Sequence, residues 1–132
     1  MGYEPKLVCF SCKFGWGYLR DLDGPKEASV FLIPVECSGK LDAIHLLKVF
    51  KEGADGVLIL ACEEGHCHFQ EGNFRALKML YLLEEVLWAH GIQKERVRIA
   101  FSLDPEGRGI PDRIVQMKNS LAALGPLDRA LL

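Results

Sequence analysis

A run of six apolar residues, Gly56–Ala61, is the feature that most limits how this chain can fold. The run has no polar residue at either set of alternating positions, which is typical of a strand buried on both faces. Such strands occur in parallel sheets, whose two faces are covered by helices. The longest apolar runs, such as residues 56–62, are far too short to cross a bilayer.

Three other segments are predicted to be strands. Residues 7–10 form a short apolar run, and Val30–Val35 is rich in β-branched and aromatic residues, with Pro34 near its end. Residues 96–103 alternate between apolar and polar side chains, which indicates one wet face and therefore an edge strand.

Helical periodicity is found between these strands, at residues 41–52, 74–90 and 112–124. The predicted apolar positions are Leu41, Ile44, Leu47 and Phe50 in the first helix, and Leu77, Leu80, Tyr81, Leu83, Leu87 and Trp88 in the second. Residues suited to begin and end these helices are Ser38 and Gly53 for the first, Asn73 and Gly91 for the second, and Pro111 and Gly125 for the third. The glycines of residues 13–23 fit either a loop or a distorted helix.

Strands and helices that alternate in this way predict an α/β fold. We expect one doubly wound domain over residues 1–132, with a mostly parallel four-stranded sheet and helices on both faces, flavodoxin-like or Rossmann-like in outline. The chain has no internal repeat and no linker, and its length fits a single domain.

Charge and the amino-terminal sequence exclude several classes of function. The formal net charge is −2, so no global positive field attracts nucleic acid. The amino terminus has no apolar segment of the kind found in signal peptides, and we expect a cytoplasmic protein without membrane association. In a reducing cytosol, clustered cysteines are metal ligands or redox groups before they are structural disulfides.

All five cysteines are predicted to lie at or just after the carboxyl end of a strand. Cys9 and Cys12 close the first strand, Cys37 follows the second, and Cys62 and Cys67 follow the third. These ends point the same way in a parallel sheet, so we expect the cysteines to converge at the edge where such folds bind ligands. Four converging thiolates suit either a 2Fe–2S cluster or tetrahedral zinc, and spacing alone does not choose between them.

The order and spacing of these motifs resemble the delta subunit of methyl-viologen-reducing hydrogenase, over about residues 6–126. The resemblance is carried by Cys9-x-x-Cys12, Cys37-Ser38-Gly39, Gly53-Ala54-Asp55-Gly56-Val57, Cys62-x-x-Gly65-x-Cys67-His68-Phe69 and Gly72-Asn73. It implies a cytoplasmic electron-transfer subunit, without catalysis of its own, whose 2Fe–2S cluster is bound by cysteines at these positions.

The resemblance also implies partners. It places the protein between a nickel–iron hydrogenase or a formate dehydrogenase and the flavin-containing subunit of a heterodisulfide reductase. The family usually reads Cys-Asn-Trp-Cys-Ser-Tyr where this chain has residues 9–14, and Cys-His-Pro-Gly-Asp-Cys where it has residues 62–67. The ligand positions are kept while their neighbours differ, and such neighbours influence the reduction potential.

The residues alone leave the ligand set open. Each close pair can hold one iron with Cys37 spare, or Cys37 can bind while one member of the first pair remains a free thiol. His66 and His68 flank Cys67 and can ligate iron, donate a hydrogen bond to a cluster sulfur, or simply belong to a polar loop.

Two other functions fit parts of the pattern. The first is a thiol–disulfide oxidoreductase that uses Cys9 and Cys12, since a Cys-x-x-Cys motif follows the first strand of an α/β fold. The second is a zinc-binding assembly protein.

Overall fold

The computed structural model describes residues 4–12, 29–35, 41–61, 72–101, 109–128, 130 and 132. Its elements follow the order β1 (Leu7–Cys12), β2 (Val30–Val35), α1 (Ala43–Lys51), β3 (Gly56–Ala61), α2 (Gly72–Ala89), a short 3-10 helix η3 (Lys94–Arg96), β4 (Val97–Phe101) and α3 (Ile110–Leu124). No helix within these ranges is both long enough and apolar enough to span a lipid bilayer.

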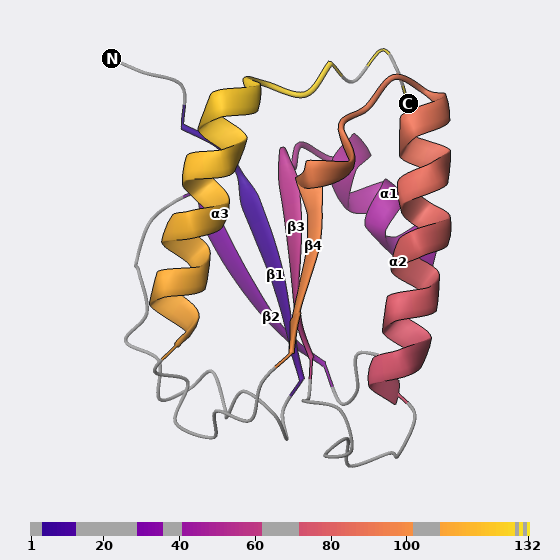
Figure 1. Cartoon of the computed structure of the whole chain (residues 1–132). Coiled ribbons are helices and arrows are strands. Elements are labelled where there is room, and N and C mark those ends of the chain that lie inside the picture. The colour runs from indigo at the N-terminus through magenta and orange to yellow at the C-terminus, as the bar shows by residue number, and fades with distance from the viewer. Residues whose placement is uncertain are drawn as a thin grey trace.

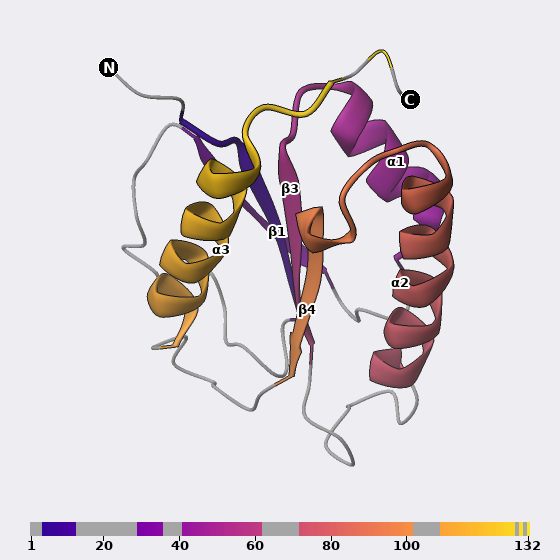
Figure 2. The same ribbon diagram turned by 45° about the horizontal axis from the view of Figure 1, so that its top comes forward.

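The four strands form one parallel sheet in the order β2-β1-β3-β4. Helices α1 and α2 cover one face, and α3 covers the other (Figures 1 and 2). This confirms the predicted doubly wound α/β fold, and the strand order matches the start of the flavodoxin-like order 2-1-3-4-5. Strand β4 lies at an edge, as its alternating pattern predicts.

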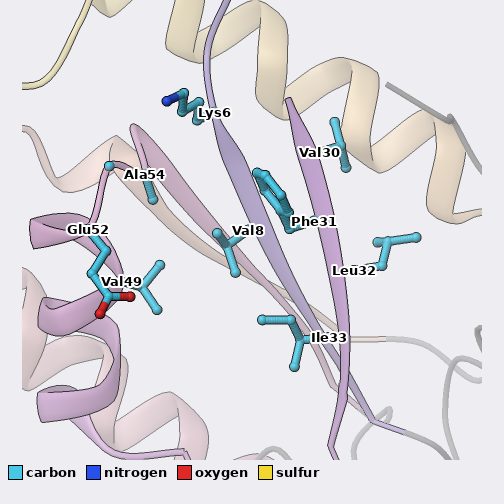
Figure 3. A pocket seen from close by; sticks show the side chains of 10 residues that line it. Lys6, Val8, Val30, Phe31, Leu32, Ile33, Val49, Glu52 and Ala54 are labelled. Atoms are coloured by element: carbon cyan, nitrogen blue, oxygen red, sulfur yellow. The ribbon is translucent and has the colours of Figure 1, made fainter. Parts of the chain in front are cut away.

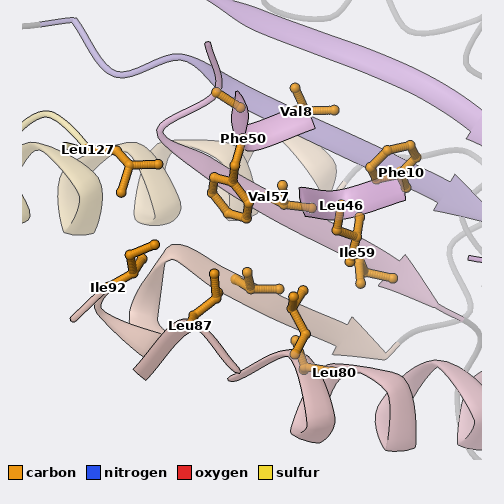
Figure 4. Close-up of a cluster of buried hydrophobic side chains, with 13 residues drawn as sticks. Val8, Phe10, Leu46, Phe50, Val57, Ile59, Leu80, Leu87, Ile92 and Leu127 are labelled. Atoms are coloured by element: carbon orange, nitrogen blue, oxygen red, sulfur yellow. The ribbon is translucent and has the colours of Figure 1, made fainter. Parts of the chain in front are cut away.

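The core lies in two layers, one on each side of the sheet. Figure 4 shows the larger layer, in which β1 and β3 pack against α1 and α2 through Val8, Phe10, Val57, Ile59, Leu46, Phe50, Leu80 and Leu87. The second layer joins the same strands to α3 through Leu7, Cys9, Leu58, Leu60, Ile114, Met117 and Leu121. All six residues of β3 are buried, which explains why this strand has no polar position.

Helix α1 differs from its prediction in its cap and in one apolar position. Asp42 is the N-cap residue, and its carboxylate accepts a hydrogen bond of 3.2 Å from the backbone N–H of Ile44. The predicted cap, Ser38, lies outside the described residues. The side chain of Ile44 is 71% exposed, whereas Leu46 is fully buried, so the predicted stripe was wrong at this position.

Helix α2 buries a narrower face than its sequence predicts. The buried side chains are Ala76, Leu80, Leu83 and Leu87, while Tyr81 and Trp88 are 59% and 62% exposed. The reason is that α2 contacts the sheet only through the row of side chains on one side of the helix.

The exposed side of α2 contacts Lys94. The Lys94 ammonium lies over the Trp88 ring, 5.8 Å from its centroid, and also pairs with Glu85 at 3.0 Å. The helix begins at Gly72, so Asn73 lies inside its first turn and is not its cap.

Helix α3 begins two residues earlier than predicted, with Pro111 in its first turn, and ends at Gly125, where φ is 79°. It lies directly against the start of β3. A Cβ atom at Gly56 would approach Leu121 Cδ1 to 2.5 Å, so a larger residue at this position would require the Leu121 side chain to shift.

A buried arginine ties the amino end of the sheet together. Arg96 is 1% exposed and ends η3, just before β4. Its guanidinium donates hydrogen bonds to the backbone oxygen of Asp55 at 3.0 Å, to that of Gly125 at 2.8 Å, and to Gln93 Oε1 at 2.8 Å. One side chain therefore links the starts of β3 and β4 to the end of α3.

The side chain of Asp55 extends this network to β1 and the carboxyl-terminal segment. Its carboxylate accepts the backbone N–H of Lys6 at 3.0 Å and that of Leu127 at 3.2 Å. Buried backbone donors need such partners because an unpaired polar group in the interior is costly.

We expect Arg96→Met to lower the free energy of unfolding by about 3 kcal/mol, because the methionine cannot satisfy the carbonyl oxygens that Arg96 serves. Urea denaturation followed by circular dichroism measures this change. Arg98→Met is the matched control on β4, since Arg98 is exposed and should cost less than about 0.5 kcal/mol. Equal costs for the two variants would contradict the anchoring role of Arg96.

Candidate functional site

The carboxyl ends of the strands meet at one edge of the sheet, the lower edge in Figure 1. Cys12, the last residue of β1, pairs with Val35, the last residue of β2, and Ala61 of β3 pairs with Phe101 of β4. Open α/β sheets bind their ligands outside this edge. In the sequence, Cys37 follows β2, and Cys62 and Cys67 follow β3.

Each of the three helices follows a strand and runs back along the sheet, so its amino terminus faces the side of this edge. The free N–H groups at a helix amino terminus carry partial positive charge and stabilise negative groups nearby. Thiolates and inorganic sulfide are such groups, so the electrostatics of this edge favour a thiolate-bound metal centre.

Cys9 does not lie at the edge. Strand β1 continues to Cys12, two residues beyond its predicted end, so Cys9 is the third of six strand residues and pairs with Leu32 and Leu58. Its side chain is fully buried beneath α3, in the layer that includes Leu58 and Ile114. The prediction that every cysteine closes or follows a strand was therefore wrong for Cys9. The reason is that residues 10–12 continue to pair with neighbouring strands.

Burial also sets the protonation state of this thiol. Desolvation among aliphatic side chains raises the pKa of Cys9 to about 12, which favours the neutral thiol at physiological pH. The thiolate is the form that binds metal and attacks disulfides. In this structure Cys9 lies among hydrophobic core residues.

The strand conformation separates Cys9 from Cys12. A strand rises about 3.3 Å per residue, so Cα atoms three residues apart lie about 10 Å from each other. A disulfide requires Cα atoms no more than about 6.8 Å apart. While β1 keeps this conformation, the two residues cannot form the disulfide that a thiol–disulfide oxidoreductase would use.

The other predicted site residues, Cys37, Cys62, Cys67, His66 and His68, lie outside the described residues. Within the described part of the chain, no three His, Cys, Asp or Glu side chains come together as metal ligands.

Ser11 is a buried polar residue near this edge that the sequence reasoning did not single out. Its side chain is 1% exposed, and its hydroxyl has no hydrogen-bond partner among the described residues. Ser11 occupies the last β1 position before Cys12 and pairs with Pro34 and Leu60. The available signal was a polar residue at a position that strand alternation places on the same face as Leu7 and Cys9, which are both buried.

A separate apolar cavity of about 540 Å³ lies between edge strand β2 and helix α1. Figure 3 shows Phe31 and Ile33 of β2 on one side and Val49 of α1 on the other. Lys6 and Glu52 are the charged residues of its lining, and no cysteine is among the described residues there. The cavity is therefore distinct from the cysteine-bearing edge.

Comparison with known proteins identifies relatives over nearly the whole chain. Residues 9–125 match the family described as methyl-viologen-reducing hydrogenase, delta subunit. The chain is 32% identical to the iron-sulfur subunit of the F420-non-reducing hydrogenase of Archaeoglobus profundus, over 94% of this chain and 93% of that protein. It is 34% identical to the corresponding vhc iron-sulfur subunit of Methanococcus voltae, over 94% of this chain and 89% of that protein.

Another relative has a different chain organisation. The ferredoxin:CoB-CoM heterodisulfide reductase of Methanosarcina mazei has one subunit that is 29% identical over 96% of this chain, which corresponds to only 16% of that much longer protein. A unit of this size is thus found both as a separate protein and within a larger reductase chain. From the family match and the full-length relatives together, the chain belongs to the family of methyl-viologen-reducing hydrogenase delta subunits.

Proposed function

We propose that this chain is an electron-transfer subunit of an oxidoreductase complex and that it carries a 2Fe–2S cluster at the carboxyl edge of its sheet. The observation that carries the proposal is the position of Cys12, which ends β1 at the edge where β2 and β3 also end. Cys37 follows β2 and Cys62 and Cys67 follow β3 in the sequence, which supports a site at the same edge. The names of the relatives support an iron–sulfur cofactor.

Among the five candidate ligands, we propose Cys12, Cys37, Cys62 and Cys67, with Cys9 as the spare cysteine. A 2Fe–2S cluster takes four thiolates, which leaves one of the five unused. Cys9 lies within a paired strand, about 10 Å from the strand end, among aliphatic side chains. This position favours the alternative in which Cys37 binds and one member of the first pair is a free thiol.

When bound, the cluster supplies one-electron chemistry. The chain contributes the thiolates, the helix amino termini that stabilise their charge, and a rigid sheet that holds the strand ends in register. We therefore expect a redox subunit without a chemical step of its own.

The partners follow from the organisation of the relatives. A similar unit forms part of the heterodisulfide reductase chain of Methanosarcina mazei, which supports binding of this protein to a reductase subunit of that type. Covalent linkage makes such an association intramolecular, while a separate protein must achieve it by binding. As electron partners we propose the flavin-containing reductase subunit on one side and a hydrogenase or formate dehydrogenase on the other.

We expect the anaerobically purified protein to be brown, with about two irons and two sulfides per chain and visible absorption that bleaches with dithionite. Absorption spectroscopy with iron, sulfide and zinc analysis measures this. A colourless protein that accepts no cluster on reconstitution would reject the proposal, and stoichiometric zinc would favour an assembly role instead.

The ligand set predicts opposite outcomes for two cysteines of the same strand. Cys12→Ala should lose most of the bound iron, because three thiolates do not complete the cluster. Cys9→Ala should keep the iron of the wild type and lose only about 1 kcal/mol of unfolding free energy, since it removes one buried heavy atom. A folded Cys9→Ala protein without iron would show that Cys9 is a ligand.

Electron transfer to the proposed partner is directly observable. We expect the reduced protein, mixed anaerobically with an oxidised flavin-containing heterodisulfide reductase subunit, to regain its visible absorption while the flavin bleaches. Stopped-flow spectroscopy follows both signals. A Cys12→Ala protein serves as the control, and unchanged flavin absorption with the wild-type chain would argue against this partner.

A further inference from the structure

Ser11 carries a buried hydroxyl that the described part of the chain leaves unpaired. Its side chain is 1% exposed, and its Oγ has no hydrogen-bond partner among the described residues. Buried polar groups in folded proteins are almost always paired, and each exception needs an explanation such as an ion or cofactor that completes the site.

The position of Ser11 limits what its partner can be. It pairs with Pro34 and Leu60, one residue before β1 ends at Cys12. The described side chains of the same core layer, such as Leu60 and Ile114, make no hydrogen bond with the Ser11 hydroxyl. Ser11 lies one residue from the carboxyl edge, where the helix amino termini favour a negatively charged group that can accept its hydrogen bond.

We propose that the Ser11 hydroxyl donates a hydrogen bond to a sulfur of the cluster, either a cysteine thiolate or an inorganic sulfide. This inference rests on the 2Fe–2S site proposed above and adds a residue that tunes it without ligating it. Hydrogen bonds to cluster sulfurs are among the factors that set the reduction potential. The reduced cluster carries one more negative charge, so the bond is stronger in that state and raises the potential.

The test compares the wild-type protein with Ser11→Ala and with the isosteric pair Ser11→Thr and Ser11→Val. Threonine keeps the hydroxyl and valine replaces it with a methyl group, so this pair separates the hydrogen bond from the change in volume. Ser29→Ala is the control at the opposite end of the sheet, because the Ser29 hydroxyl donates to Glu4 Oε1 at 3.0 Å there.

Redox titration monitored by electron paramagnetic resonance gives the first measurement. At the wild-type midpoint, we expect the ratio of oxidised to reduced cluster to rise about tenfold in Ser11→Ala and Ser11→Val, which is a shift of about 59 mV for one electron. Ser11→Thr and Ser29→Ala should keep the wild-type potential. In electron–nuclear double resonance, an exchangeable proton coupled to the reduced cluster should disappear in the alanine and valine variants only.

The outcomes separate this inference from the function on which it rests. A wild-type protein that takes up no iron would reject the proposed function itself. Wild-type iron content, with the same potential and the same exchangeable proton in Ser11→Val as in Ser11→Thr, would overturn the role of Ser11 and leave the cluster in place. If Ser11→Ala does not fold, the threonine and valine pair still decides the question.

Discussion

The Arg96 guanidinium, buried at the amino end of the sheet, holds the architecture on which the site depends. It serves carbonyl oxygens of two segments far apart in the chain, while the Asp55 carboxylate beside it binds the start of β1 and the segment after α3. These bonds fix the amino ends of the three neighbouring strands β1, β3 and β4. They also hold the segment after α3 against that edge of the sheet. The opposite, carboxyl edge is the one at which Cys12 lies.

Because the strands pair in parallel, fixing their amino ends also fixes the positions of the residues at their carboxyl ends. Because β1 pairs with both β2 and β3 in fixed register, the depth of each β1 residue in the sheet is set by its neighbours. Cys9 is thereby placed in the interior beneath α3, and Cys12 is placed at the end of the strand, on the sheet edge. Two cysteines that form one motif in the sequence thus lie at different depths in the sheet. The buried Ser11 hydroxyl lies between them, next to the edge.

The relatives show the same unit in two contexts. In Archaeoglobus profundus and Methanococcus voltae it corresponds to nearly a whole hydrogenase subunit, and in Methanosarcina mazei it corresponds to a small part of a reductase chain. The hydrogen bonds at the amino edge of the sheet are made within this chain, so they are compatible both with a separate subunit and with a segment of a longer chain. Its two core layers are filled by its own strands and helices, and its carboxyl edge is the side on which we propose the redox site.

The sequence by itself determined the α/β class, the strands Val30–Val35 and Gly56–Ala61, the edge position of the fourth strand and the family, because hydrophobic periodicity and motif spacing are local signals. The end of β1, the width of the buried face of α2, the capping of α1 by Asp42, and the surroundings of Cys9 and Ser11 were decided only by the tertiary structure. Strand length depends on pairing with segments distant in sequence, and the chemistry of a thiol or a hydroxyl depends on burial by those same segments. Cys9 and Cys12 look equivalent as letters of one motif, and only their depth in the sheet distinguishes a core residue from a candidate ligand.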